Sequence, residues 1–141
     1  MDDQKRRKLV DRIAALNALP TTMPVVPLDA FFDGNDDLGS IGCNLGDDHP
    51  GLDRFREVLA GVKKRRDVQD VLVGIFEAME EDTSWPFSET VYVLTSASAS
   101  AVQEWVAELQ PDEVEEGFLD GPPPGLPPLG DGMMPVRLWW D

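Results

Sequence analysis

Residues 68–95 read VQDVLVGIFEAMEEDTSWPFSETVYVLT, and this stretch decides the fold. Its first part, residues 68–79, is rich in β-branched and aromatic side chains, although Val71, Ile75 and Met79 also fit one face of a helix. Because Gly74 is unfavourable inside a helix and a continuous apolar run suits a buried central strand, we predict a strand here. Residues 90–95 predict a second strand, and the acidic segment 80–89 predicts the loop between the two.

The segments on either side extend this hairpin into a sheet with two helices. Residues 51–62 repeat apolar side chains at helical spacing and lead into the basic run 63–66, which suits a helix C-terminus. A second helix is predicted over residues 100–109, between a capping box at its start and Pro111. Short apolar runs at residues 40–45 and 136–140 predict two further strands. From residue 40 the order is therefore βαββαβ, which predicts a ferredoxin-like α+β fold with a four-stranded antiparallel sheet and helices on one face.

The remaining segments are expected to surround this core in a single domain of residues 1–141. Residues 1–20 predict an additional N-terminal helix. Residues 21–39 predict a connector, since their prolines oppose a long regular element, and the apolar residues within 28–32 are expected to dock onto the core. Residues 111–117 predict a short helix, and the Pro- and Gly-rich residues 119–135 predict a stiff, polyproline-like loop.

The chain has 141 residues and a formal net charge of −15, and its acidic excess lies in the second half. Residues 1–66 carry as many Lys and Arg as Asp and Glu, whereas residues 67–136 carry no Lys or Arg. A segment of this kind repels phosphate, so we expect no binding to nucleic acid or to an anionic membrane and favour a protein partner with a basic surface. The alternative is that the acidic surface serves solubility alone.

The surface predicted to bind a partner combines acidic runs with two aromatic residues. Trp85 and Phe87 stand beside acids in the loop 80–89, where large apolar side chains anchor a partner and charges steer it. The alternative is that both fold back as a lid on the core, and Trp85→Ala would then lower the melting temperature strongly. The residues assigned to this surface are Glu80, Glu81, Asp82, Trp85, Phe87, Asp112, Glu113, Glu115 and Glu116.

Patterns for catalysis, metal binding and phosphate binding are weak or missing. Cys43 and His49 are a conceivable nucleophile and base, yet nothing near them in the sequence resembles an oxyanion loop. Asp33, Asn35 and Asp37 have the spacing of the first ligands of a calcium loop, but the glycine and the glutamate of such a loop are not at the required positions. No phosphate-binding or dinucleotide-binding motif occurs. We therefore expect no enzyme activity, no cofactor and no bound metal.

These observations favour a small acidic protein that binds another protein. The classes that fit are bacterial immunity proteins, antitoxins and secretion chaperones, which cover basic surfaces of their partners. A cytoplasmic location is expected from the lone cysteine and from the lack of a long apolar run. Two alternatives stay open: a small-molecule or metal-binding domain, including an enzyme, that uses residues 33–49, and an acidic mimic of nucleic acid.

Overall fold

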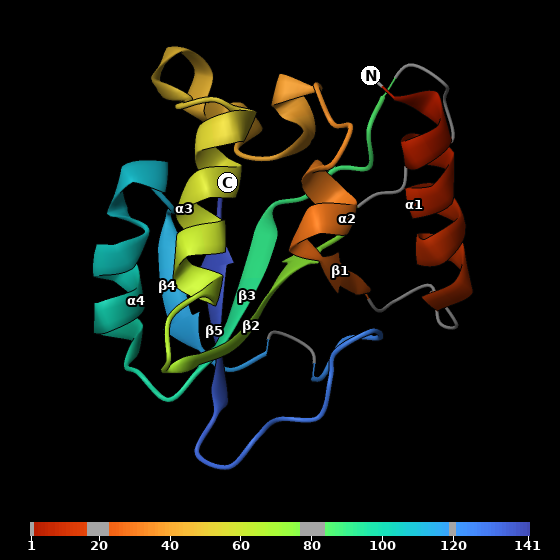
Figure 1. Cartoon of the computed structure of the whole chain (residues 1–141). Coiled ribbons are helices and arrows are strands. Elements are labelled where there is room, and N and C mark those ends of the chain that lie inside the picture. Colours follow the sequence, from red (N-terminus) through yellow and green to blue (C-terminus); the bar gives the residue numbers. More distant parts are fainter. Residues whose placement is uncertain (1, 17–22, 77–83, 119–120) are drawn as a thin grey trace.

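The computed structural model describes residues 2–16, 23–76, 84–118 and 121–141, and its centre is an antiparallel sheet (Figure 1). The sheet has five strands in the order β1-β2-β3-β5-β4. Neighbouring strands along this order are all antiparallel. The strands are β1 (Val25–Pro27), β2 (Val68–Gly74), β3 (Thr90–Thr95), β4 (Glu113–Glu116) and β5 (Met134–Trp139).

Four helices cover one face of this sheet (Figure 1). All four contribute buried apolar side chains to the same core cluster, which explains why they share a face. Three short 3-10 segments, Leu38–Ser40, Cys43–Asp48 and Ala107–Leu109, connect them to the strands. The helices are α1 (Asp3–Leu16), α2 (Leu28–Phe32), α3 (Leu52–Lys63) and α4 (Ala99–Trp105).

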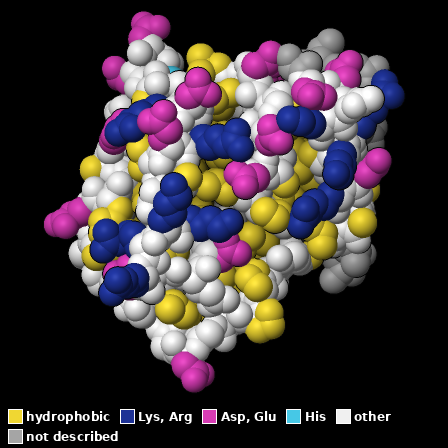
Figure 2. Space-filling model, in the orientation of Figure 1, with side chains coloured by type: hydrophobic (Ala, Val, Ile, Leu, Met, Phe, Trp, Pro, Cys, Tyr) yellow, Lys and Arg dark blue, Asp and Glu magenta, His cyan; other side chains and the backbone are white. Residues whose placement is uncertain are grey.

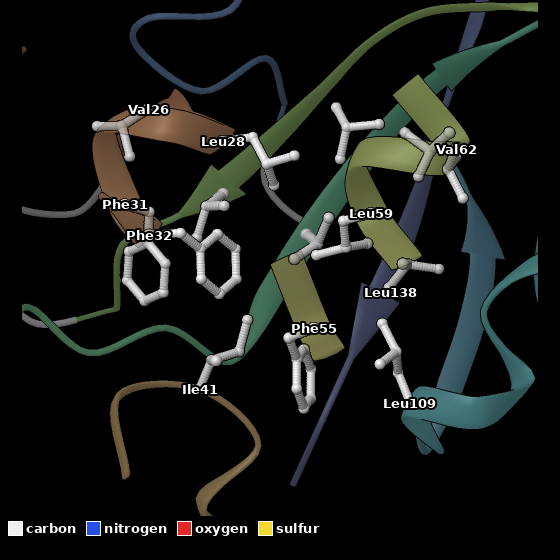
Figure 3. Close-up of a cluster of buried hydrophobic side chains, with 14 of the residues drawn as sticks. Val26, Leu28, Phe31, Phe32, Ile41, Phe55, Leu59, Val62, Leu109 and Leu138 are labelled. Carbon is white, nitrogen blue, oxygen red and sulfur yellow. The ribbon is translucent and has the colours of Figure 1, made fainter. Parts of the chain in front are cut away.

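The main core lies between the helices and the sheet. Along α3 the buried side chains are Phe55, Leu59 and Val62, which recur at the spacing of one helical face and point toward the strands (Figure 3). Val71 and Val73 of β2 belong to the same cluster, as alternation along a strand requires. Burying each side chain of this size stabilises the fold by about 1.5–3 kcal/mol.

The opposite face of the sheet is also buried, under the Pro- and Gly-rich segment. Leu72, Tyr92 and Leu94 form a second apolar cluster, against which Phe118 and Leu126 pack. The backbone N–H of Val25 in β1 donates to the carbonyl oxygen of Pro124 (2.9 Å). Because the central strands are covered on both faces, they carry consecutive apolar residues rather than a strict alternation.

The α+β class, the antiparallel sheet and the strand predicted over residues 90–95 are confirmed for the described residues. The strand predicted over 68–79 is β2, which ends at Gly74; residues 75–76 are not in a strand, and residues 77–79 lie outside the described residues. The strand predicted at 136–140 is β5, which begins two residues earlier. The predicted N-terminal helix is described as far as Leu16, and residues 17–20 lie outside the described residues. The loop predicted over 119–135 has no helix or strand at residues 121–133.

The four-stranded ferredoxin-like arrangement is wrong, and the first of its strands accounts for the error. Residues 40–45 are not a strand; only Ile41 pairs, through an isolated bridge to Ser88. Gly42 and Gly46 have φ angles of 64° and 57°, so their backbone leaves the extended region on both sides of Cys43. The first strand lies instead in the predicted connector, as β1, and β4 replaces the short helix predicted at 111–117.

Candidate functional site

One end of the sheet gathers acidic residues from four separate segments of the chain. Gly74, Thr90, Trp139 and Glu113 stand in one row across the sheet, and the segments beyond this row form its upper end in Figure 1. We call the carboxylates there the acidic end. They belong to Asp37, Asp47, Asp48, Glu89, Asp112 and Asp141.

Backbone and side-chain hydrogen bonds hold these segments together. Ser88 N–H donates to the carbonyl oxygen of Ser40 (2.7 Å), which joins the strand leading into β3 to the first 3-10 segment. The Gln110 side chain donates from Nε2 to the carbonyl oxygen of Asp48 (3.3 Å). The backbone N–H of Asp141 donates to the Asp112 carboxylate (2.6 Å). The segments that carry these carboxylates are thus held at one end of the sheet by the fold.

Ion pairs occur elsewhere on the molecule but not at the acidic end. On the helical face, Figure 2 shows Lys and Arg side chains interspersed with Asp and Glu. There Lys5 pairs with Asp33 at 2.8 Å, Arg56 pairs with Asp29 at 3.2 Å and Arg54 pairs with Glu108. In the part of the chain that the structure describes, no ion pair reaches a carboxylate of the acidic end.

The basic run 63–66 lies at the other end of the sheet. Helix α3 begins at Leu52 beside the acidic end and finishes at Lys63, immediately before β2 starts. Lys63 pairs with Asp70 (3.7 Å) and Arg65 with Asp67 (3.1 Å), so the acids that follow this run are partly neutralised. The basic run and the acids that pair with it therefore lie at the opposite end of the sheet from the acidic end.

Four of the residues predicted to bind a partner, Asp112, Glu113, Glu115 and Glu116, lie together at the outer edge of the sheet. Glu113 and Glu115 have a structural role, because both pair with Arg137 of β5, which is only 8% exposed. Arg137 Nη2 lies 3.1 Å from Glu113 Oε2 and 3.6 Å from Glu115 Oε2. A buried guanidinium requires such partners. Asp112 and Glu116 are exposed without an ion pair in the described residues.

The other predicted residues have different outcomes. Glu80, Glu81 and Asp82 lie outside the described residues. Trp85 is 1% exposed and belongs to the main core, so the structure supports the lid rather than the exposed anchor. Phe87 is half-buried beside it.

A pocket of about 300 Å³ opens over Trp85. The rings of Phe76 and Phe87 meet edge to face on its wall, with centroids 5.9 Å apart. Asp37 helps to position Trp85 at this pocket, because its carboxylate accepts the backbone N–H of Trp85 (3.1 Å). We call it the Trp85 pocket, and its lining residues are Asp37, Gly39, Ser40, Phe76, Ser84, Trp85 and Phe87. It therefore joins part of the predicted 33–49 region to the predicted aromatic loop.

The indole nitrogen of Trp85 is buried and has no hydrogen-bond partner among the described residues. Trp140 is buried to the same extent, and its Nε1 donates to the carbonyl oxygen of Leu109 (2.8 Å). Buried indole N–H groups normally find an acceptor, so the Trp85 donor is exceptional. The sequence did not predict Phe76 as a site residue. Its only signal there is that it is an apolar residue near the end of the run from which the strand over 68–79 was predicted.

The residues considered for calcium are engaged with the protein itself. The Lys5 ammonium donates to Asp33 and holds the pKa of that carboxyl below its usual range. The Asn35 side-chain oxygen accepts the backbone N–H of Asp37 (2.9 Å), and Asp37 accepts from Gly39 (3.2 Å) as well as from Trp85. Across residues 2–16, 23–76, 84–118 and 121–141, no group of three or more His, Cys, Asp or Glu has a metal-binding arrangement.

Cys43 and His49 do not form a nucleophile and base pair. The His49 ring accepts the backbone N–H of Gly51 at Nδ1 (2.9 Å), and its Nε2 lies 2.8 Å from the carbonyl oxygen of Ile41. Since Nδ1 is an acceptor, the ring proton belongs to Nε2 and is donated to Ile41. Both ring nitrogens are thus used by the backbone before helix α3, and Cys43 is exposed.

Comparison of the sequence with known proteins identifies the family of this chain. A family model described as "Uncharacterized protein YfbO family" matches residues 4–138. The chain belongs to the YfbO family. It is 38% identical over 135 residues to "Uncharacterized protein YfbO" of Escherichia coli (strain K12). The aligned residues make up 95% of this chain and 94% of that protein. No solved structure matches the chain. The range matched to the YfbO family includes the whole Trp85 pocket and all of the acidic end except Asp141.

In the part of the chain that the structure describes, none of the helices has the length and apolar character needed to cross a bilayer.

Proposed function

We propose that this YfbO-family chain is a protein-binding module that holds a basic partner at its acidic end. The observation that carries the proposal is that four segments bring carboxylates to one end of the sheet and that no ion pair reaches them among the described residues. Like charges brought together in this way repel one another. A cationic surface placed over them is attracted to every carboxylate, and this attraction offsets the repulsion between the carboxylates.

Charge of this kind acts mainly on the rate and specificity of association. A negative surface steers a positive partner into contact and rejects anionic surfaces, which argues against phosphate-rich ligands. This behaviour suits a cytoplasmic, non-enzymatic inhibitor that covers the basic active site of another protein, as immunity proteins, antitoxins and some secretion chaperones do.

Variants of the second 3-10 segment test the proposal without disturbing the fold. Asp47 and Asp48 are exposed, and neither side chain has a hydrogen bond or ion pair in the described residues. Asp47→Asn/Asp48→Asn removes two charges from the acidic end. Asp11→Asn/Asp131→Asn removes two exposed charges from α1 and from the turn before β5, and is the matched control.

Each purified variant is used to capture proteins from a lysate of the organism that encodes it, with mass spectrometry as the readout. We expect the wild type and the control to retain one stoichiometric basic protein, and the Asp47→Asn/Asp48→Asn variant to lose most of it at low salt. Equal capture by both variants, or retention of acidic proteins only, would contradict the proposal. Competition of the captured protein with DNA then distinguishes a nucleic-acid mimic from another inhibitor.

A further inference from the structure

We propose that the Trp85 pocket receives a bulky apolar side chain from the partner, on a segment that carries Lys or Arg next to it. This inference rests on the proposed function and adds the feature that the partner must present. It is carried by two properties of the pocket: its exposed apolar rim and its charge.

The rim exposes apolar surface that is not covered by the described residues. Phe76 and Leu38 are each 52% exposed, and no other large apolar side chain in the described residues is more exposed. Phe76 lines the pocket, and Leu38 lies between the lining residues Asp37 and Gly39 in the 3-10 segment Leu38–Ser40. Apolar residues exposed around one pocket are typical of an anchor site for a partner side chain.

The size and the walls of the pocket fit one side chain rather than a large ligand. Its volume is about 300 Å³, which is at the lower limit of ligand-binding pockets. The rings of Phe76 and Phe87 meet edge to face at its wall, and Trp85 also lines it although Trp85 is only 1% exposed. An aliphatic or aromatic side chain placed there gains apolar contacts on several sides.

The charge of the pocket selects the neighbours of that side chain. Asp37 is its one ionisable lining residue in the described part of the chain, and it also belongs to the acidic end. Its carboxylate accepts only backbone N–H groups, from Gly39 and Trp85, and no guanidinium or ammonium group pairs with it there. A Lys or Arg beside the apolar residue of the partner meets this charge, whereas Asp or Glu at the same place is repelled.

Three short peptides test the inference directly: acetyl-Lys-Leu-Lys-amide, acetyl-Lys-Ala-Lys-amide and acetyl-Glu-Leu-Glu-amide. Each is titrated into the full chain while the assigned indole N–H resonance of Trp85 is followed by NMR. We expect a saturable shift with the leucine peptide and affinity about tenfold lower with the alanine peptide, since the pocket buries most of the leucine side chain. The glutamate peptide should produce no saturable shift.

Phe76→Ser and Leu129→Ser give a matched pair of variants. Both remove an exposed apolar side chain, since Leu129 is 41% exposed and does not line the pocket. Phe76→Ser should weaken binding of the leucine peptide about tenfold, and Leu129→Ser should leave it unchanged.

Several results would overturn the inference. These are a Trp85 resonance that does not respond, equal affinity for the leucine and alanine peptides, and equal losses in Phe76→Ser and Leu129→Ser. Acetyl-leucine-amide binding as tightly as the charged peptide would also overturn it, because the site would then serve a small apolar ligand. If Phe76→Ser still captures the lysate partner while Asp47→Asn/Asp48→Asn does not, the pocket inference fails and the proposed function stands.

Discussion

The two buried tryptophans allow a matched test of the unpaired indole donor of Trp85. Trp85 and Trp140 are both 1% exposed, but only Trp140 has an acceptor, the carbonyl oxygen of Leu109 at 2.8 Å. Replacing either with phenylalanine removes a similar apolar area, for a loss of about 1–2 kcal/mol. Trp140→Phe also leaves a buried carbonyl oxygen unpaired, for a further loss of about 1–3 kcal/mol.

Urea denaturation of the two variants measures this difference as a change in the free energy of unfolding. Trp140→Phe should be less stable than Trp85→Phe by about 1–3 kcal/mol, or by roughly 4–12 °C in melting temperature for a domain of this size. Trp85→Ala, which empties the site, should lose about 3–5 kcal/mol because the side chain is part of the core. Equal losses in the two phenylalanine variants would show that the Trp85 indole N–H is hydrogen-bonded in solution, and would refute this reasoning.

Three further predictions concern other parts of the fold. Gly125 and Gly121 have φ angles of 92° and 87°, but only at Gly125 would a Cβ lie 2.5 Å from a backbone oxygen of β1, so Gly125→Ala should be less stable than Gly121→Ala in urea by about 1–3 kcal/mol. Glu113→Gln removes the nearest charge from the buried guanidinium of Arg137 and should reduce the free energy of unfolding by about 1–3 kcal/mol, whereas a rise in stability would contradict this role. The arginine partner of Glu108 on α3 lowers the pKa of that carboxyl, so its contribution to stability is complete at neutral pH and is lost as the pH falls through the lowered value. The melting-temperature difference between the wild type and Glu108→Gln should therefore disappear in acid, and a difference that grows in acid would show the opposite linkage.

The central strands could be predicted from the sequence because burial on both faces leaves a clear apolar run in each. β2 and β3 are such strands, and their neighbours on either side are themselves strands. The two edge strands were missed for physical reasons. β1 ends in a proline, which is tolerated at an edge, and β4 has three glutamates in four residues, so its pairing with β5 overrides a low strand propensity.

The candidate site could be predicted only where its residues are close in sequence. Asp112 and Glu116 were assigned to a surface, and the structure places them on one edge. Sequence spacing could not show that Glu113 and Glu115 face a buried arginine, because Arg137 is more than 20 residues away. Nor could it show that Asp47, Asp48 and Asp112 meet at one end of the sheet, since that depends on which strands are neighbours.

The most direct test of the acidic end is the rate at which the chain associates with the basic partner it captures. Stopped-flow association rates are measured across a range of salt for the wild type, Asp47→Lys/Asp48→Lys and the control Asp11→Lys/Asp131→Lys. If the acidic end steers the partner, the wild-type rate falls steeply with salt and the Asp47→Lys/Asp48→Lys rate is about tenfold lower at low salt, converging with the wild type at high salt. A wild-type rate that does not change with salt, or an equal loss in the control, would contradict the account.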